Sequence, residues 1–341
     1  MIYEDSRVTD FDLRATAAAM VRPGTGILAI DESIATCNSR LRVLGMDPTD
    51  AARHGYRELL LDTDGLAEHV SGVILFDETF RQATTAGVAF PDLLTQRGIL
   101  PGIKVDTGAK PLAGRPGETV TEGLDGLRER IGAYRKLGAR FAKWRAVITI
   151  GDARPSRNAI VANAHALARY AALCQEGGLV PIVEPEVLRD GAHDLERCHG
   201  VTGDVLAEVF AQLDLAGVDL AAMVLKPSMV LPGSAAPPAR IETVAAATMD
   251  CLRSSVPTTA AGVAFLSGGQ TPSAATEHLA AMVRLGPHPW PLTFSYGRAI
   301  QDDVLRTWAE HRPDSAAART VLLARIRANG EASLGRLVAV A

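Results

Sequence analysis

Eight short apolar segments alternate with longer helix-like stretches along this chain, and that alternation constrains its fold more than any other feature. The segments are rich in Val, Ile, Leu and Phe, and most lack the strict alternation of polar and apolar residues. This pattern is typical of strands that are buried on both faces. We predict strands at 26–31, 72–79, 102–106, 140–150, 179–186, 221–227, 262–269 and 291–298.

The stretches between these segments have helical composition, for example at 121–139, 157–178 and 203–217, and the last two end on Gly, a common helix stop. Eight strands, each followed by a segment long enough for a helix, predict a single (β/α)8 barrel over residues 1–341. We expect its strands within about 26–298, C-terminal helices and a tail over 299–341, and extra helices at both ends. A doubly wound open sheet is disfavoured because no G-x-G-x-x-G follows the first strand.

Composition narrows the classes of function. The 341 residues are 47% hydrophobic, enough for one large core, and the formal charge of −4 with no long basic tract argues against nucleic acid as a partner. No window approaches 18 uncharged apolar residues, so we expect no membrane association. The N-terminal segment carries acidic residues and lacks the pattern of a secretory signal.

The cysteines and histidines give no reason to propose a metal site or another cofactor. Cys37, Cys174, Cys198 and Cys251 lie far apart without a C-x-x-C pair, and the histidines show no H-E-x-x-H spacing. Well-separated cysteines in a chain of this size predict reduced thiols and a cytoplasmic location.

Polar residues fall late in the predicted strands or just beyond them. Because all strands of a barrel run parallel, these side chains should gather at its C-terminal rim, where barrel enzymes carry their chemistry. A single polar strand end is explained by solvation, but contributions from most of the strands to one rim indicate a site. The residues concerned are Asp31, Glu32, Lys104, Asp106, Lys143, Arg145, Glu184, Glu186, Lys226, Ser267, Ser295 and Arg298.

Lys226 is the strongest candidate for a nucleophile. Five apolar residues precede it in the segment AAMVLKP, and Pro227 follows it. A lysine on a buried strand, crowded by Lys104, Lys143 and other cations, has its ammonium form disfavoured, which frees the amine to attack a carbonyl. The alternative interpretation of the cationic cluster is simple anion binding.

Nearby carboxylates could move the protons that imine chemistry requires. Glu184 and Glu186 are two residues apart on one strand and therefore share a face. We expect their repulsion to raise the pKa of one of them into a useful acid–base range, with Asp31 as a further carboxylate across the barrel. Partnership with the lysines is the plainer interpretation, and the two are compatible.

Two groups of residues are suited to anions. Ser267, Gly268 and Gly269 follow the seventh strand, and Ser295, Gly297 and Arg298 lie at the end of the eighth, where this fold often binds phosphate. The second group is Ser33, Thr36 and Arg40, with Lys104 and Arg145 expected to face it, although Ser33 could simply cap a helix. Two anion sites flanking a nucleophilic lysine predict a substrate with phosphate at both ends.

These residues resemble those of the class I, Schiff-base fructose-1,6-bisphosphate aldolases. The likeness runs from GTGILAIDES at 24–33 to LTFSYGRAIQ at 292–301. Its most specific stretches are GARFAKWRAVITI (138–150), GLVPIVEPEVLRDGAHDLERC (178–198), VLKPSMVLPG (224–233) and FLSGGQ (265–270). The resemblance implies a glycolytic and gluconeogenic lyase that reversibly cleaves fructose 1,6-bisphosphate to dihydroxyacetone phosphate and glyceraldehyde 3-phosphate, without a metal.

By matching positions, the resemblance makes Lys226 the imine-forming lysine and Glu184 the general acid–base. Glu186 matches a carboxylate that tunes Lys226, Lys143 a lysine that assists imine formation, and Asp31 an aspartate that orients the substrate hydroxyls. The 1-phosphate region then comprises Ser267, Gly268, Gly297 and Arg298, and the 6-phosphate region Ser33, Thr36, Arg40, Lys104 and Arg145. The resemblance also implies a homo-oligomer, often a tetramer.

Some features depart from the family pattern. The second strand has Asp77 where His is usual, and the chain ends GRLVAVA, with no tyrosine after Tyr296, although animal members end in a tyrosine that assists proton exchange on the enamine. Other preferred ketoses, such as sedoheptulose 1,7-bisphosphate or fructose 1-phosphate, remain open. So do another Schiff-base barrel, such as a transaldolase or a 2-keto-3-deoxy sugar aldolase, and an inactive barrel scaffold.

Overall fold

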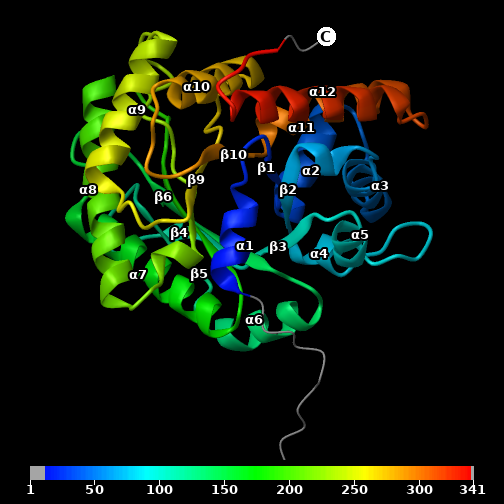
Figure 1. The fold of residues 1–341 in the computed structure, drawn as a ribbon, viewed down its shortest axis with the longest axis horizontal. Coiled ribbons are helices and arrows are strands. Elements are labelled where there is room, and N and C mark those ends of the chain that lie inside the picture. The colour runs from blue at the N-terminus through cyan, green and yellow to red at the C-terminus, as the bar shows by residue number, and fades with distance from the viewer. Residues whose placement is uncertain (1–11, 339–341) are drawn as a thin grey trace, which may run out of the picture.

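The eight predicted strands form one closed parallel barrel in the computed structural model, which describes residues 12–338 (Figure 1). The order around the barrel is β1-β10-β9-β8-β7-β6-β3-β2, so each strand lies beside its neighbours in the chain once a separate hairpin, β4–β5, is set aside. The barrel strands are β1 (Gly26–Ile30), β2 (Val70–Leu75), β3 (Leu100–Lys104), β6 (Phe141–Ile148), β7 (Val180–Val187), β8 (Val224–Leu225), β9 (Gly262–Phe265) and β10 (Leu292–Tyr296).

Helices surround this barrel and extend beyond it at both ends of the chain, as predicted (Figure 1). The α-helices are α1 (Leu13–Met20), α2 (Ile34–Val43), α3 (Asp50–Leu61), α4 (Asp77–Phe80), α5 (Phe90–Gln96), α6 (Leu127–Lys136), α7 (Arg157–Glu176), α8 (Leu195–Leu215), α9 (Ile241–Ser255), α10 (Pro272–Arg284), α11 (Arg298–His311) and α12 (Ala316–Ala332). Two 3-10 turns, η1 (Leu66–Glu68) and η2 (Leu220–Ala222), precede β2 and β8. Within residues 12–338, no helix has both the length and the apolar character needed to cross a membrane.

Several predicted boundaries were wrong, each for a local reason. The predicted strand 72–79 ends at Leu75, since Asp77 begins the short helix α4, and the predicted strand 221–227 is reduced to two residues after η2. The helix expected at 203–217 begins earlier, because the side chain of Asp194 caps it by accepting a hydrogen bond from the Arg197 amide.

A two-stranded antiparallel sheet, β4 (Gly108–Pro111) with β5 (Thr119–Glu122), was not predicted and takes the start of the expected helix 121–139. Asn163 on α7 fixes it, because its side chain accepts from the Thr121 amide and donates to the Thr119 carbonyl. The hairpin follows β3 directly and therefore lies at the C-terminal rim of the barrel.

The barrel interior is apolar at the N-terminal end of the strands and polar at their C-terminal end. Lumen-facing side chains near the strand starts are apolar and pack with the buried face of α1 through Met20 and Val21. The Phe141 ring fills the space beside Gly72 and Gly102: a Cβ added at Gly102 would lie 2.1 Å from Phe141 Cε2. An apolar floor therefore closes the N-terminal end of the barrel.

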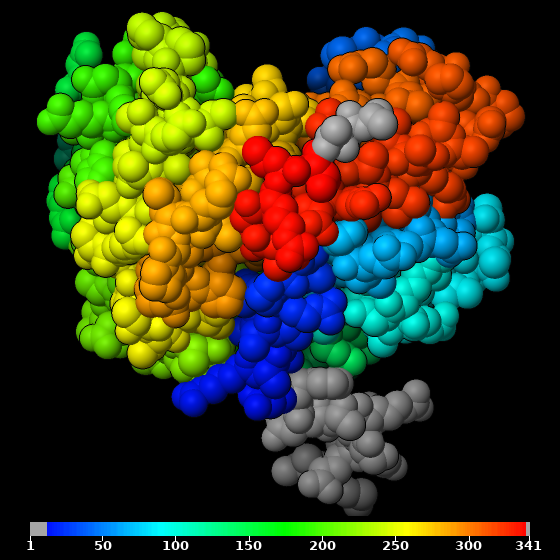
Figure 2. Space-filling view, turned by 45° about the horizontal axis from the view of Figure 1, so that its top comes forward, coloured from blue at the N-terminus to red at the C-terminus, as the bar shows by residue number. Residues whose placement is uncertain are grey.

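The C-terminal part of the described chain packs against the segment after α1. Figure 2 shows the end of α12 and the residues after it, in red, beside the blue N-terminal region. The Gly24 amide donates to the Ser333 hydroxyl at 3.0 Å, and the Leu334 side chain lies against Gly24.

Candidate active site

Alternation along the strands carries charged side chains into the barrel above its apolar floor. On β6 the inward residues run Phe141, Lys143, Arg145, and on β7 they continue from Ile182 to Glu184 and Glu186. A cavity of about 810 Å³ opens at this C-terminal end. Fifteen predicted site residues line it: Asp31, Ser33, Thr36, Arg40, Lys104, Lys143, Arg145, Glu184, Glu186, Lys226, Ser267, Gly268, Ser295, Gly297 and Arg298.

Gly269 is the predicted site residue that does not line this cavity. Its φ of +76° and that of Gly268, +54°, are in the left-handed region, where glycine is favoured. Gly269 therefore serves the turn that positions Ser267 and Gly268, and its contact with a ligand stays a prediction.

Lys226 lies directly after β8 and is almost fully buried, with 3% of its surface exposed. Its amide donates to the Val183 carbonyl at 2.8 Å, which continues the barrel ladder one residue beyond the strand. Its Nζ lies 3.1 Å from Glu184 Oε1. A rigid strand end thus points an amine into the cavity beside a carboxylate.

Lys143 is the second buried amine, and it links two carboxylates. Its Nζ lies 2.9 Å from Asp31 Oδ2 and 2.9 Å from Glu184 Oε2. Burial alone would lower the pKa of Lys143, but Asp31, Glu184 and Asp106 outweigh burial and raise it well above its ordinary value. Its two carboxylate partners thus favour the charged form of Lys143, whose ammonium faces the cavity.

Asp31 and Glu184 are held ionised, although the sequence predicts a raised pKa for either Glu184 or Glu186. Burial favours the neutral form of Asp31, yet Lys143, Lys226 and Lys104 together lower its pKa to about 2. For Glu184 as well, burial is outweighed by Lys143, Lys226 and Arg145, so its pKa is lowered. The prediction failed for Glu184 because both of its oxygens face lysines, so Glu184 begins as a base rather than as an acid.

Glu186 has a different partner from the one expected. It forms an ion pair with Arg145 Nε, whereas the carboxylate on Lys226 is Glu184. Lys104 is likewise paired, with Asp106 Oδ1 at 2.9 Å. Glu186 and Lys104 thus each have an oppositely charged partner within the rim.

The predicted 1-phosphate region has donors without partners. The Ser295 hydroxyl is buried and has no hydrogen-bond partner among residues 12–338. Arg298 begins α11, lines the cavity and forms no ion pair with any described residue. A helix N-terminus adds backbone N–H groups and a positive dipole end, which favour an anion.

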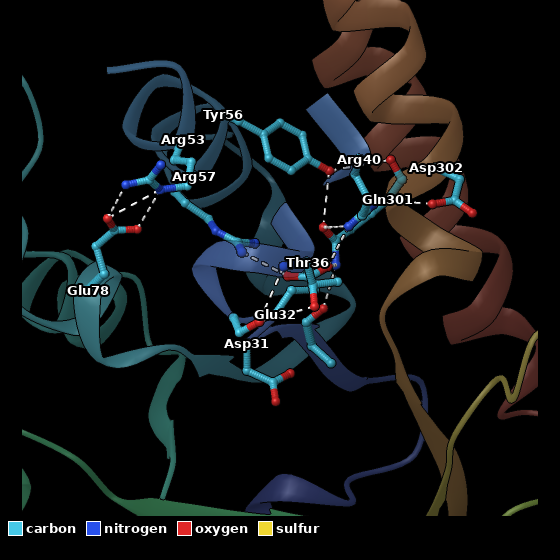
Figure 3. Close-up of polar contacts among 12 residues, drawn as sticks. Asp31, Glu32, Thr36, Arg40, Arg53, Tyr56, Arg57, Glu78, Gln301 and Asp302 are labelled. Atoms are coloured by element: carbon cyan, nitrogen blue, oxygen red, sulfur yellow. Dashed lines mark hydrogen bonds and ion pairs between the residues drawn. The ribbon is translucent and has the colours of Figure 1, made fainter. Parts of the chain in front are cut away.

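The opposite side of the cavity contains a cluster around Glu32 that the sequence did not predict (Figure 3). Glu32 Oε2 accepts from Arg57 at 2.8 Å, and Oε1 accepts from Arg40 and Gln301 at 2.5 and 2.7 Å. Arg40 also reaches Asp302 on α11 at 2.9 Å. Burial of Glu32 is outweighed by both arginines, which lower its pKa.

Ser33 caps a helix, which is the structural role that the sequence allowed for it. It is the N-cap of α2, and its hydroxyl accepts from the Thr36 amide at 3.3 Å and lies 3.1 Å from the Thr36 hydroxyl. Both side chains also line the cavity, so capping and ligand contact are compatible.

Two further cavity residues, Arg130 and Tyr134, were missed. They lie four residues apart on α6, and this i, i+4 spacing on one helix face was the only signal for them. The Tyr134 hydroxyl donates to Asp77 Oδ1 at 2.7 Å. Tyr296, by contrast, is buried outside the cavity and donates to the Ala275 carbonyl at 2.8 Å. The tail residues 339–341 lie outside the described residues.

In the part of the chain between residues 12 and 338, no group of three or more His, Cys, Asp or Glu side chains could hold a metal ion. The fold and the site together define a (β/α)8 barrel enzyme with a buried amine, its carboxylate partner and anion-binding groups on two sides of one cavity.

Comparison with known proteins identifies the family. The family model described as fructose-bisphosphate aldolase class-I matches residues 12–341. A probable fructose-bisphosphate aldolase class 1 of Xanthomonas axonopodis pv. citri is 55% identical over 326 residues, covering 95% of this chain and 98% of the relative. Fructose-bisphosphate aldolase 2 of Caenorhabditis elegans is 50% identical over 328 residues, covering 95% and 89%.

A solved structure agrees. Fructose-bisphosphate aldolase from Plasmodium falciparum, in a ternary complex with TRAP and a small-molecule inhibitor, has a TM-score of 0.94 and 46% identity, covering 96% of this chain and 95% of that one. The chain belongs to the class-I fructose-bisphosphate aldolase family and is a lyase, which confirms the predicted fold, family and enzyme class.

Proposed function

We propose that this chain cleaves fructose 1,6-bisphosphate reversibly through an imine on Lys226, giving dihydroxyacetone phosphate and glyceraldehyde 3-phosphate. The observation that carries the proposal is the placement of a 3%-exposed amine 3.1 Å from an ionised carboxylate, at the bottom of a cavity with anion-binding groups on two sides. Simple anion binding would not need a buried amine beside its own base.

Imine formation uses the Glu184 carboxylate first as a base. Glu184 takes a proton from the Lys226 ammonium, and the neutral amine attacks the C2 carbonyl carbon to form a carbinolamine. The protonated Glu184 then gives that proton to the departing hydroxyl, which leaves as water, so the carboxylate is regenerated. Lys143 stays cationic throughout and stabilises negative charge that develops on the oxygen.

Cleavage follows from the charge of the iminium. The C4 hydroxyl loses its proton to the nearby carboxylates, among which Asp31 and Glu184 are the candidates, and the C3–C4 bond electrons move toward the iminium nitrogen. The aldehyde is released and an enamine remains on Lys226. Protonation of C3 and hydrolysis of the imine release the ketose phosphate and restore the lysine.

Phosphates anchor both ends of the substrate in this proposal. We assign the 1-phosphate to Ser267, Gly268, Ser295, Gly297 and Arg298, because Ser295 and Arg298 have no partner among the described residues. The 6-phosphate and nearby hydroxyls then face Ser33, Thr36, Arg40, Lys104 and Arg145. Anchoring at both ends favours fructose 1,6-bisphosphate over a monophosphate.

Three further assignments belong to the same proposal. The chain functions as a single domain spanning 1–341 and assembles as a homotetramer, with neither a nucleic acid nor a membrane as partner. Its location is the cytoplasm, which is supported by four buried free cysteines and by two Arabidopsis thaliana relatives named as cytosolic aldolases, 48% identical to this chain.

Borohydride trapping tests the imine directly. Protein mixed with dihydroxyacetone phosphate and borohydride is expected to carry a reduced adduct on Lys226, identified by peptide mass spectrometry. Lys226→Met should lose both the adduct and cleavage activity while its circular dichroism spectrum is unchanged. An adduct on Lys143 instead, or substantial cleavage by folded Lys226→Met, would overturn the assignment.

A further inference from the structure

We infer that Asp302 sets the affinity of the active site for the phosphate that faces Arg40, by occupying the outer side of the Arg40 guanidinium until that phosphate displaces it. Asp302 lies on α11 and does not line the cavity, so it acts through Arg40 as a specificity-determining, positioning residue. The inference rests on the proposed function for the identity of the anion, but the contacts that carry it are properties of the described chain.

Arg40 is held on two unequal sides (Figure 3). On its inner side, Nη1 donates to Glu32 at 2.5 Å and to Gln301 at 3.1 Å, and the Glu32 side chain is only 16% exposed. On its outer side, Nη2 donates to Asp302 at 2.9 Å, and that carboxylate is 47% exposed. Ion pairs open to water are weak, so the outer contact is the one that a ligand can replace.

The inner side is fixed by groups that do not depend on Asp302. Arg57, which lies on α3, donates to Glu32 at 2.8 Å, and Gln301 donates to the Ala29 carbonyl at 2.6 Å. Tyr56 in turn donates to the Gln301 side chain at 3.1 Å. These contacts keep the Arg40 guanidinium at the cavity wall whether or not Asp302 is paired with it.

Asp302 neutralises a positive charge that the other ion pairs of this cluster leave unmatched. Glu32 carries one negative charge and is shared by two arginines, so this group of three has one positive charge left over, at the outer side of Arg40. Asp302 cancels that charge. An incoming phosphate must therefore replace one anion by another, and the displaced carboxylate, which is already half exposed, returns to water.

Two consequences follow for binding. Removing the Asp302 charge leaves the positive charge at the outer side of Arg40 unmatched and removes a carboxylate that repels the phosphate, so a ligand with a phosphate at this end should bind more tightly. A ligand that lacks this phosphate should be unaffected. Asp302 therefore reduces the preference of the site for a bisphosphate over a monophosphate.

The test compares two substrates in matched variants. Asp302→Asn keeps the shape of the side chain and removes its charge, and we expect KM for fructose 1,6-bisphosphate to fall about two- to fivefold at low salt, the size of a half-exposed ion pair. The KM for fructose 1-phosphate and both kcat values should stay unchanged. Asp302→Ala should behave in the same way, and the gain should shrink at high salt.

Asp303→Asn is the matched control, because Asp303 is the adjacent residue on α11 but binds Arg325 at 2.6 Å, away from the cavity. An unchanged KM for the bisphosphate in both Asp302 variants would overturn the inference. So would an equal change for both substrates, or the same change in Asp303→Asn.

Binding measured without chemistry separates this inference from the proposed function. Calorimetric titration with a hexitol bisphosphate, which has no carbonyl and cannot form an imine, should show the same two- to fivefold tighter binding in Asp302→Asn as in the kinetic test. If wild-type protein cleaves neither ketose, the proposed function fails, and the titration alone decides the role of Asp302. Equal affinity of wild type and Asp302→Asn for the hexitol bisphosphate would refute it.

Discussion

Glu184 is the residue whose replacement tests the proton-transfer scheme most directly, because one carboxylate serves two buried amines. Its two oxygens lie 2.9 Å from Lys143 Nζ and 3.1 Å from Lys226 Nζ. A glutamine in its place can offer its oxygen to one ammonium group only, and its NH₂ must then face the other. Glu184→Gln therefore removes the base and also leaves one lysine opposite a donor.

The size of the effect follows from the role. Positioned acid–base groups contribute about 10²–10⁴-fold to rate, or about 2.7–5.4 kcal/mol of transition-state stabilisation. Because Glu184 is proposed to act in both the attack and the dehydration, we expect Glu184→Gln to lower kcat by about 10³-fold, within that range. Lys143 keeps Asp31 as its partner at 2.9 Å, so the fold should survive.

The assay measures kcat and KM for fructose 1,6-bisphosphate cleavage, together with the rate of borohydride trapping on Lys226. Glu186→Gln is the matched control, since Glu186 lies on the same strand but its ion pair is with Arg145. We expect its loss of kcat to be at least about tenfold smaller. If Glu186→Gln slows trapping as much as Glu184→Gln does, Glu184 is not the acid–base group.

Two further predictions concern stability. The pKa of Asp31 is about 2 in the folded chain, against an ordinary 3.8, so its ionised form stabilises the fold by about 2 kcal/mol above pH 3.8 and this contribution disappears as the pH falls toward 2. Denaturant titrations at several pH values should show a weaker pH dependence of the free energy of unfolding in Asp31→Asn. An unchanged pH dependence would contradict the pairing of Asp31 with Lys143. Gly102→Ala should lower the free energy of unfolding by about 1–3 kcal/mol, because the new Cβ would lie 2.1 Å from Phe141 Cε2. Gly132→Ala on α6 is the control, because a Cβ there would meet nothing within 4 Å, and it should be neutral or stabilising. Thermal unfolding of both variants measures the difference.

The barrel and the centre of its site were predictable because their signals are local. Buried parallel strands leave apolar runs, and a lysine or a glutamate inside such a run stands out, as at Lys226 and Glu184. Parallel strands also end at one rim, so strand order was not needed to bring these residues together. The polar residues that line the cavity were thus predictable wherever a strand end supplied them.

Contacts between distant segments were not predictable in the same way. The partner of Glu186 depends on the register between β6 and β7, where Arg145 lies opposite Glu184. The Glu32 cluster draws on α2, α3 and α11, whose relative positions no local pattern fixes. Arg130 and Tyr134 line the cavity from α6, and no local pattern fixes the position of that helix at the rim either.

The pKa expectation failed for a related reason. Two carboxylates two residues apart predict repulsion, but the three-dimensional arrangement puts two cations beside Glu184. Its oxygens face Lys143 and Lys226, which come from β6 and from directly after β8. Sequence spacing measures distance along one strand, whereas the pKa depends on the nearest charge from any strand.

The apolar floor formed by Phe141 and α1 leaves one route by which substrate and products can enter and leave the barrel. With that end closed, the cavity is a blind one, and the substrate and both products share a single mouth at the C-terminal rim. In the proposed mechanism, the half of the sugar attached to Lys226 is held by a covalent bond, while the aldehyde is not. We therefore expect ordered release, with the aldehyde leaving first, and in the reverse direction the ketose phosphate should enter before the aldehyde.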